Sequence, residues 1–222
     1  MMSRAISSSS KASRSPGSRG AGRPFRARRR HAWRIALASV AVCSVATAAP
    51  AAWAEDAPAD GEFVMTTSPG VLPALTSDGI RLAGLNPASV VTNATTGSAS
   101  ATLPIVARNG TANATGGGLR FTNNATAASV ICANPVVDTK ARVIDCVIAG
   151  SANRALFTIH SLGARTVVTS RGQVTQRFTD MVLRVADSPT ADYLNRELQT
   201  NAFSPYVNLA TADLTVTTPR SG

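Results

Sequence analysis

Most of the chain consists of short runs in which apolar and polar residues alternate, and these runs recur about every ten residues. Alternation with a period of two predicts half-buried β-strands, because successive side chains of a strand point to opposite faces of its sheet. In the run at 178–186, Met181 and Leu183 fall on one face and Asp180 falls on the other. The strands predicted in this way cover residues 101–107, 118–123, 129–137, 142–148, 154–162, 165–170, 178–186 and 210–217.

Turn-forming residues rich in Gly, Asn and Ser separate these runs, as at Asn109-Gly110. One helix is predicted among the strands, at residues 188–198, with Ser188 as its cap and Pro189 at its first helical position. Many short strands and a single short helix near the C-terminus predict an all-β domain with antiparallel strands. Strand spacing alone suits either a sandwich or a barrel.

The charged residues are divided unevenly along the 222-residue chain. Residues 1–54 contain ten Lys and Arg and no acid, whereas residues 55–222 contain twelve basic and twelve acidic residues. The net charge of +10 therefore belongs to the first segment, and the remainder is neutral with no basic run. This distribution argues against nucleic acid as a partner. The chain has only two Lys among its 22 basic residues, a bias typical of high-GC bacteria such as actinobacteria.

The first 54 residues have the order of a signal peptide. A basic n-region at 1–34 precedes an apolar h-region at 35–49, which Pro50 ends. Small residues one and three positions before the junction predict cleavage between Ala54 and Glu55, as signal peptidase requires. The protein is thus expected to be secreted or associated with the cell envelope, with no membrane segment after cleavage.

Some alternatives to this interpretation of the leader stay open. Cleavage could fall after Ala48, the apolar run could act as an uncleaved anchor, or the segment could be an organelle transit peptide. The export route is either the general one or the twin-arginine one, because Arg29-Arg30 precede the apolar run. With cleavage after residue 54, residues 55–79 form an N-terminal segment, and a β domain covers residues 80–222.

Two cysteines, Cys132 and Cys146, follow the signal segment. In an exported protein a pair of cysteines predicts one disulfide. If 130–137 and 142–148 form a hairpin with its turn centred on Thr139, Cys132 lies directly opposite Cys146. Direct cross-strand partners are close enough for a disulfide bond.

Catalytic signatures are scarce after residue 54. His160 is the only histidine there, which argues against a histidine metal site, and no Gly-x-Ser-x-Gly elbow, phosphate loop or dinucleotide fingerprint occurs. Asp145 and Asp180 are predicted to face outward from strands and not to form a glycosidase pair. We therefore expect no enzymatic activity and no bound metal.

A series of short motifs resembles a known group of domains. It includes Leu-Asn-Pro at 85–87, Gly-Gly-Leu-Arg-Phe at 117–121, the predicted helix with Tyr193, Asn-Ala-Phe at 201–203 and the last strand at 212–216. In this order the chain resembles β-rich secreted and cell-surface domains of actinobacteria and, more distantly, the haem-transport-associated (HtaA-type) domains. The resemblance implies an antiparallel two-sheet, immunoglobulin-like sandwich, which we take as the expected fold.

The same resemblance would suggest haem as a cofactor. The domains of that group usually open with a segment bearing Trp and Tyr that supplies the iron-binding tyrosine, and nothing in residues 55–81 corresponds to it. A haem ligand would have to come from Tyr193, Tyr206 or His160. The function expected first is a non-enzymatic binding or structural role with an unknown surface or extracellular partner and no cofactor. Binding or transport of haem or another small ligand is the alternative.

Overall fold

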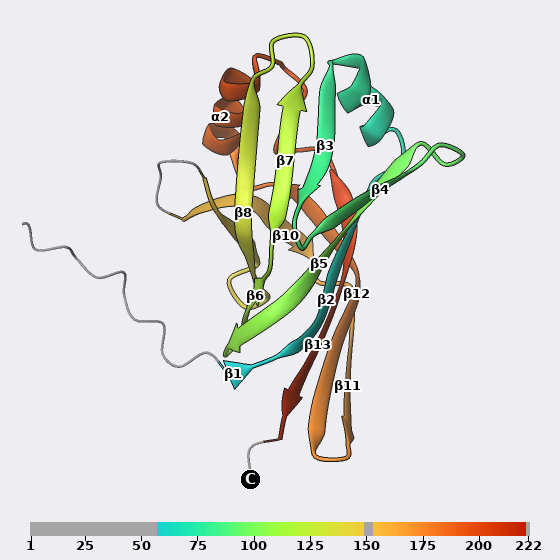
Figure 1. Cartoon of the computed structure of the whole chain (residues 1–222), viewed down its shortest axis with the longest axis vertical. Helices are drawn as coiled ribbons and strands as arrows, with labels where there is room; N and C mark the ends of the chain where they lie inside the picture. Colours follow the sequence, from blue (N-terminus) through green and yellow to red (C-terminus); the bar gives the residue numbers. More distant parts are fainter. Residues whose placement is uncertain (1–56, 149–152, 221–222) are drawn as a thin grey trace, which may run out of the picture. The chain divides into compact units, whose positions relative to one another are not determined.

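The computed structural model describes residues 57–148 and 153–220 (Figure 1). Antiparallel strands account for most of these residues, so the all-β prediction is confirmed. The predicted signal segment and its cleavage site between Ala54 and Glu55 lie outside the described residues. In the described part of the chain, no helix has the length and apolar character needed to cross a membrane.

The secondary-structure elements follow one another in a simple order. They are β1 (Ala57–Pro58), β2 (Asp60–Thr67), α1 (Val71–Ser77), β3 (Ile80–Leu85), β4 (Ser89–Asn93), β5 (Ser98–Asn109), β6 (Ala112–Thr115), β7 (Gly118–Asn123), β8 (Ser129–Asp138), β9 (Val143–Val147), β10 (Arg154–Ser161), β11 (Ala164–Ser170), β12 (Gln173–Val185), α2 (Ser188–Leu198) and β13 (Ala210–Pro219). All eight strands predicted from the alternation are present, as β5 and β7 to β13.

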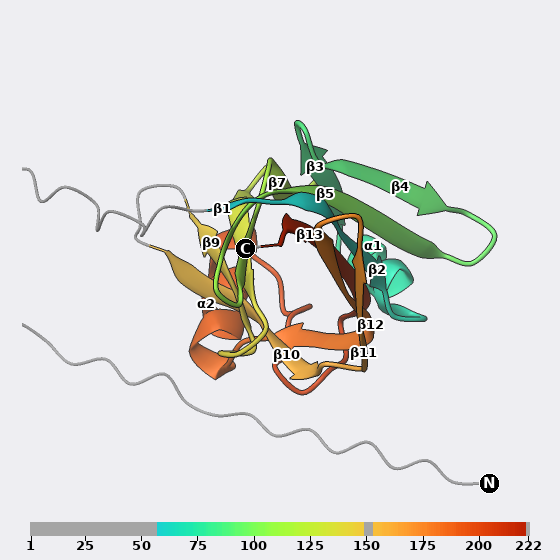
Figure 2. The same cartoon turned by 90° about the horizontal axis from the view of Figure 1, so that it is seen from below.

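Eight of the described strands close into a ring. The order β5-β2-β13-β12-β10-β9-β8 is continuous, and β6 pairs with both β8 and β5 to complete it. Figure 2 shows these strands around a common interior. Outside the ring, β11 pairs with β12 and β4 pairs with β5. β7 pairs with β8 on one side and with β3 on the other.

This closed barrel corrects the immunoglobulin-like sandwich expected from the sequence. Both architectures bury one face of every strand, so apolar alternation does not distinguish them. Closure depends on β6, which has four residues and buries the polar side chains of Asn113 and Thr115. A strand with a polar buried face gives no apolar alternation, so β6 was not predicted from the sequence.

The wall of the barrel parts at one place beyond β6. There β5 pairs with β4 through residues 98–102, and β8 pairs with β7 through residues 129–133. β7 pairs in turn with β3, but among the described strands β3 and β4 do not pair with each other. Figure 1 shows β3 and β4 running close at one end and separating toward α1.

The core fills the barrel and extends under α2. Phe121 lies between Phe157 and Phe203, with ring centroids 6.4 and 5.9 Å apart respectively. The helix adds Leu194 and Leu198, both fully buried. Its cap is Asp187 and not Ser188, because the Asp187 carboxylate accepts a hydrogen bond of 2.7 Å from the Thr190 amide.

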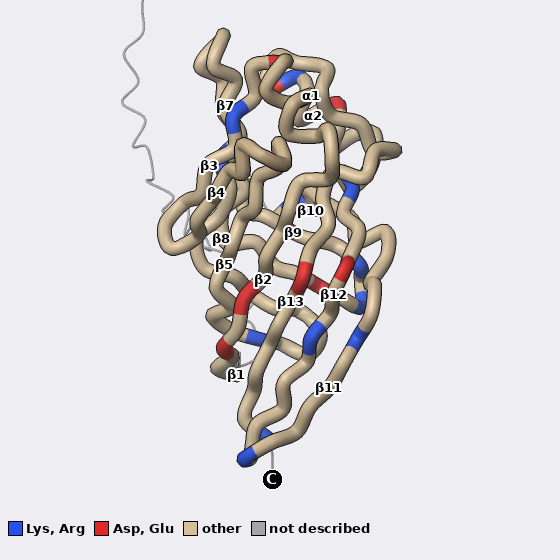
Figure 3. Tube along the Cα trace, turned by 90° about the vertical axis from the view of Figure 1, so that its right-hand side faces the viewer, with Lys and Arg blue, Asp and Glu red and all other residues tan. Residues whose placement is uncertain are grey.

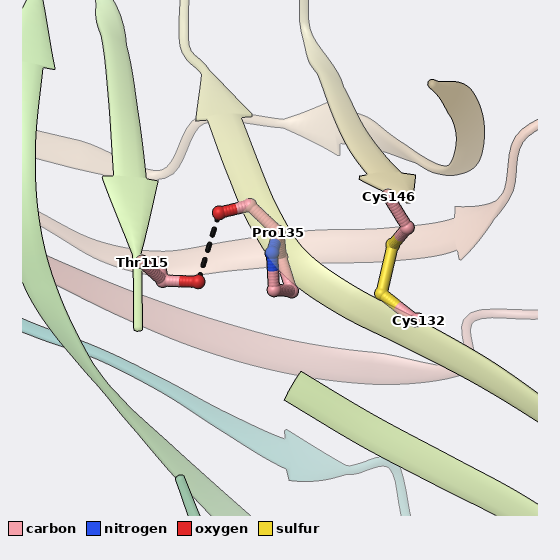
Figure 4. The surroundings of a disulfide bond; sticks show 4 residues. All are labelled: Thr115, Cys132, Pro135 and Cys146. Atoms are coloured by element: carbon pink, nitrogen blue, oxygen red, sulfur yellow. Dashed lines mark hydrogen bonds between the residues drawn. A yellow bond between two sulfur atoms is a disulfide. The ribbon is translucent and has the colours of Figure 1, made fainter. Parts of the chain in front are cut away.

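The predicted disulfide is present between β8 and β9, with Cα atoms 5.0 Å apart (Figure 4). The hairpin is confirmed, but its register differs from the expected one. Ala133 pairs with Val147, so Cys132 and Cys146 lie diagonally and not directly opposite. The shift follows an irregularity between residues 133 and 136, where Pro135 lacks an amide and its carbonyl accepts from the Thr115 hydroxyl at 2.8 Å.

The sheet begins earlier than residue 80. β2 lies in the segment 55–79, and it pairs with β13 on one side and β5 on the other. Its buried face carries Phe63 and Met65. On the side of the molecule drawn in Figure 3, acidic residues lie on β2, β12 and β13, with basic residues between them and toward β11.

Candidate ligand-binding groove

A groove occupies the place where the barrel wall parts between β3 and β4. Its volume is about 540 Å³, within the range of sites that hold small ligands or peptide segments. We call it the β3 groove. Its walls come from α1, β3, β4 and one residue after β7: Leu72, Thr76, Gly79, Ile80, Arg81, Leu82, Ala83, Gly84, Val90, Thr92 and Asn124.

β3 contributes its edge to this groove. Five consecutive residues, 80–84, line it, whereas a strand that presented one face would contribute every second residue. β3 pairs with β7 along its other edge. Backbone N–H and C=O groups on the groove side are therefore available to another strand.

β4 contributes a face and not an edge. Val90 and Thr92 line the groove, and the intervening Val91 is 67% exposed on the opposite face. Val90 is half-buried and packs against the core. The groove thus has a strand edge on one wall and a partly apolar strand face on the other.

The two walls meet at a close backbone contact. A Cβ atom at Gly84 would lie 2.5 Å from the carbonyl oxygen of Ala88, so only glycine permits this approach. Gly117 packs equally closely against the backbone of Leu85 and Pro87. These glycines hold β3 and β4 together at one end, and the groove widens from there toward α1 (Figure 1).

α1 closes the wide end. Leu75 is buried and anchors the helix, while Leu72 and Thr76 line the groove. The Thr76 hydroxyl donates to the Leu72 carbonyl at 2.8 Å, so its hydrogen is already used within the helix. Backbone bonds from Gly79 to Thr76 and from Asn124 to Gly79 fix the junction between α1, β3 and β7.

The groove carries one ionisable side chain, Arg81. Its other lining residues are apolar or neutral, and none is Asp, Glu, His, Cys, Lys or Tyr. Such a lining provides backbone hydrogen bonds, apolar contacts and a single positive charge. A threonine hydroxyl needs a neighbouring general base to act as a nucleophile. The lining residues provide no such base next to Thr76 or Thr92.

The residues considered for haem lie elsewhere and do not line the β3 groove. Tyr206 is 80% exposed in the segment between α2 and β13, and His160 is exposed near the end of β10. Tyr193 packs against the core, and the guanidinium groups of Arg154 and Arg196 lie 4.5 and 5.5 Å from its ring centre. These contacts suit a packing role for Tyr193.

A haem does not fit the residues of the β3 groove, because none of them can ligate iron through an imidazole, phenolate or sulfur atom. Nor do the described residues contain a cluster of three or more His, Cys, Asp or Glu arranged to hold a metal ion.

Asp145 and Asp180, the two candidate catalytic aspartates, lie on different strands. Asp145 is half-buried on β9 between the buried Ile144 and Cys146, so it faces away from the core. Burial raises the pKa of the Asp145 carboxyl, and the negative charge of Asp138 raises it further. Asp180 is exposed on β12, where its amide donates to the Asp213 carboxylate at 3.0 Å.

The β3 groove is not apparent from the sequence. Residues 80–93 contain no sustained alternation, and β3 and β4 were not predicted as strands. The Gly79 and Gly84 positions and the Leu-Asn-Pro motif at 85–87 mark the ends of β3, but nothing in them shows that its edge stays unpaired. That property belongs to the closed ring and not to the local sequence.

Comparisons with known proteins found one similar solved structure and no similar family or curated protein. No family model matches the chain, and no curated protein matches it. Among solved structures, the crystal structure of the haem-binding protein HtaB from Corynebacterium glutamicum is similar, with a TM-score of 0.42 and 12% sequence identity. The similarity covers 72% of this chain and 94% of that one. No residue of this chain takes a role from that protein.

Proposed function

We propose that this protein is an exported, non-enzymatic binding domain that holds an extended polypeptide segment in the β3 groove. One observation carries the proposal: five consecutive residues of β3, whose second edge pairs with no other described strand, line a groove of about 540 Å³. An extended peptide adds to such an edge as a further strand, and its main chain provides most of the binding energy.

The dimensions suit a short segment. β3 has six residues, and at roughly 3.3 Å per residue its edge extends for about 20 Å. Alternate side chains of an added strand point to opposite sides. One set would contact the apolar wall formed by Leu72, Leu82 and Val90, and the other would face solvent.

The charge of the groove selects among peptides. Arg81 is exposed at the edge of the groove, and no acid lines it. A peptide with a carboxylate opposite Arg81 gains a charge-assisted hydrogen bond, whereas a basic peptide is repelled. The expected partner is therefore an extended segment with apolar residues at alternate positions and at least one acidic residue.

The proposed location is outside the cytoplasm. The basic and apolar order of residues 1–54 supports export, and the Cys132–Cys146 disulfide supports an oxidising compartment. N-terminal sequencing of protein recovered outside the cells should find Glu55 first. An intact Met1 on that protein would contradict the proposal of a cleaved leader.

Two substitutions on β4 test the binding site. A library of random seven-residue peptides displayed on phage is selected against the purified protein, and the enriched peptides are synthesised. Val90→Trp fills the groove and should weaken their binding at least about tenfold, because the apolar wall is blocked. Val91→Trp adds the same ring on the exposed face of the same strand and should leave affinity unchanged.

The charge preference has its own pair of variants. Arg81→Glu should abolish the preference for acidic peptides. Arg120→Glu reverses an exposed charge on the adjacent strand β7 and is the matched control. Failure to enrich any peptide, or equal binding to the Val90→Trp variant, would contradict the proposed function.

A further inference from the structure

A second candidate site lies at one end of the barrel, where β5 finishes and β6 begins (Figure 1). Arg108 is the central residue of this site. Alternation along β5 buries Ala101, Leu103 and Ile105, and an unbroken pattern would turn Arg108 outward. The register with β6 shifts between Ile105 and Ala107, and this bulge turns Arg108 to the inner face.

Arg108 is half-buried, and its Nε atom donates to the Gly110 carbonyl at 2.7 Å. Two observations show that its side chain turns toward the inner face of the barrel. Its direct cross-strand partner is Asn113, which is buried. Its Nη2 atom donates to Oε1 of Gln176 at 3.2 Å. Gln176 lies on β12, and β2 and β13 separate β12 from β5 in the ring, so this hydrogen bond spans the interior of the barrel.

A second guanidinium group belongs to Arg165, an exposed residue of β11, which lies outside the ring. Arg165 pairs across strands with Phe178, a core residue, and its guanidinium carbon lies 5.6 Å from the centre of the Phe178 ring. Burial lowers the pKa of Arg108, and the positive charge of Arg165 lowers it further, which agrees with the two groups being neighbours.

No carboxylate of the described residues compensates these two charges. Asp60 and Glu62 on β2 alternate with the buried Phe63 and Met65 and so face outward. Asp138 accepts hydrogen bonds from the Thr111 hydroxyl and from two amides of its own turn. Residues 164–179 contain three arginines and no acid, and Figure 3 shows the same imbalance along β11.

Asn113 adds an unpaired acceptor beside Arg108. It is 3% exposed, and its Nδ2 atom donates to the carbonyl oxygens of Thr111 and Val137 at 3.1 and 3.2 Å. Its Oδ1 atom is buried with no hydrogen-bond partner. Because both hydrogens of the amide are used, the orientation of the group is fixed, and Oδ1 is left as an acceptor for a donor on a ligand or water.

We propose that Arg108, Arg165, Gln176 and Asn113 form a binding site for a small carboxylate that carries a neighbouring hydroxyl group. The carboxylate matches the planar guanidinium of Arg108 and is also attracted by Arg165. The hydroxyl group donates to Oδ1 of Asn113. This site is separate from the β3 groove and shares no residue with it.

The test uses three probes with the purified protein. Titration calorimetry with L-malate should show saturable binding, and succinate, which lacks the hydroxyl, should bind at least about fivefold more weakly because it leaves Oδ1 unpaired. Inorganic phosphate distinguishes a general anion site from the proposed one. Phosphate binding as tight as that of malate would overturn the assignment of the ligand class.

Matched variants locate the site. Arg108→Gln and Arg165→Gln should each weaken malate binding at least about tenfold. Arg177→Gln removes the same charge from an exposed position next to Gln176 and should have no such effect. Asn113→Ala should reduce the preference for malate over succinate to about unity, a readout that lost stability alone does not produce.

Malate binding at this site does not depend on peptide binding in the β3 groove. Val90→Trp should leave malate binding unchanged, and Arg108→Gln should leave peptide binding unchanged. Absence of saturable binding for every probe, or equal losses with Arg177→Gln and Arg108→Gln, would overturn the proposal.

Discussion

Among single residues, Asn123 joins three parts of the structure. It lies at the end of β7 and is buried. Its Nδ2 atom donates to the Leu198 carbonyl at the end of α2, at 2.8 Å, and its Oδ1 atom accepts from the Ala125 amide at 2.9 Å. One side chain therefore satisfies a helix C-terminus and a turn, two places where backbone groups lack regular partners.

Asn123→Ala should lower the free energy of unfolding by about 2 kcal/mol, because it leaves the buried Leu198 carbonyl without a donor. Urea denaturation measures this change. Asn201→Ala removes an exposed amide shortly after Leu198 in the sequence and should change stability by less than about 0.5 kcal/mol. Equal stability of the Asn123→Ala variant and the parent would show that this hydrogen bond contributes nothing.

The direction of individual side chains was predictable from the sequence where a strand is regular. Met181, Leu183 and Val185 are fully buried on one face of β12, as the alternation predicts. Arg108 was not predictable in this way, since the bulge in β5 reverses its direction and Pro104, just before the bulge, does not by itself specify one. Bulges of this kind depend on pairing with a neighbouring strand, which local sequence does not specify.

Among the elements, helix α2 depends on its N-terminal cap. Hydrogen bonds from Thr190 lower the pKa of Asp187, and the Thr190 hydroxyl has a larger effect than the Thr190 amide. A lowered pKa means that the ionised carboxylate stabilises the folded state above the unfolded-state pKa of about 3.9, and that this contribution is lost as the pH falls below it.

Asp187→Ala should therefore cost about 1 kcal/mol at pH 7, and the difference from the parent should shrink as the pH falls below about 4. Thermal unfolding at several pH values measures it. Asp192→Ala removes an exposed acid from the same helix and serves as the control. A difference between parent and Asp187→Ala that grew on acidification would contradict this role of the cap.

The β8–β9 hairpin depends on the disulfide at its far end. Cys132→Ser should destabilise the protein by about 2–4 kcal/mol, because the bond restricts the unfolded chain and both sulfur atoms are buried. The intact protein should also have a lower mass than the reduced protein by two hydrogen atoms. Free thiols titrating in the native exported protein would contradict the bond.

At the scale of the elements, the sequence identified this hairpin and its cysteine pair but not its register. Asn134 has a positive φ of 44° and its amide donates to the Gly117 carbonyl outside the hairpin, while Pro135 has no amide to donate. The Asn-Pro pair signals an irregularity, yet its size depends on contacts with β6 and β7. Those contacts come from strands far apart in the sequence.

For the whole molecule, closure by β6 decides where a ligand can bind. The four residues of β6 join β5 to β8 and complete the ring. Beyond β6, β5 pairs with β4 and β8 pairs with β7, and the β3 groove lies where β3 and β4 stay unpaired. The sequence predicted the all-β class and most strands of the ring. It did not predict closure, because the buried residues of β6 are Asn113 and Thr115.

Haem binding is tested on the whole protein. Haemin added to the purified protein should give no sharp, saturable Soret change, since Tyr206 is 80% exposed and Tyr193 is packed against the core between two guanidinium groups. Tyr193→Phe and Tyr206→Phe should behave like the parent. A one-to-one titration abolished by either substitution would establish a haem site.

Among the described strands, β3, β4 and β11 each pair along one edge only, and β3 and β11 provide an internal comparison. β3 lines the groove with five consecutive residues, whereas no residue of β11 lines it and all seven residues of β11 are exposed. We expect peptides to bind at β3, because the groove adds apolar contacts and the charge of Arg81 to the backbone hydrogen bonds.

Backbone amide hydrogen exchange with and without a selected peptide distinguishes these two edges directly. Amides within residues 80–84 should exchange more slowly in the complex, and those of β11 should be unchanged. Slower exchange along Ala164–Ser170 without any change in β3 would contradict the assignment of the groove as the binding site.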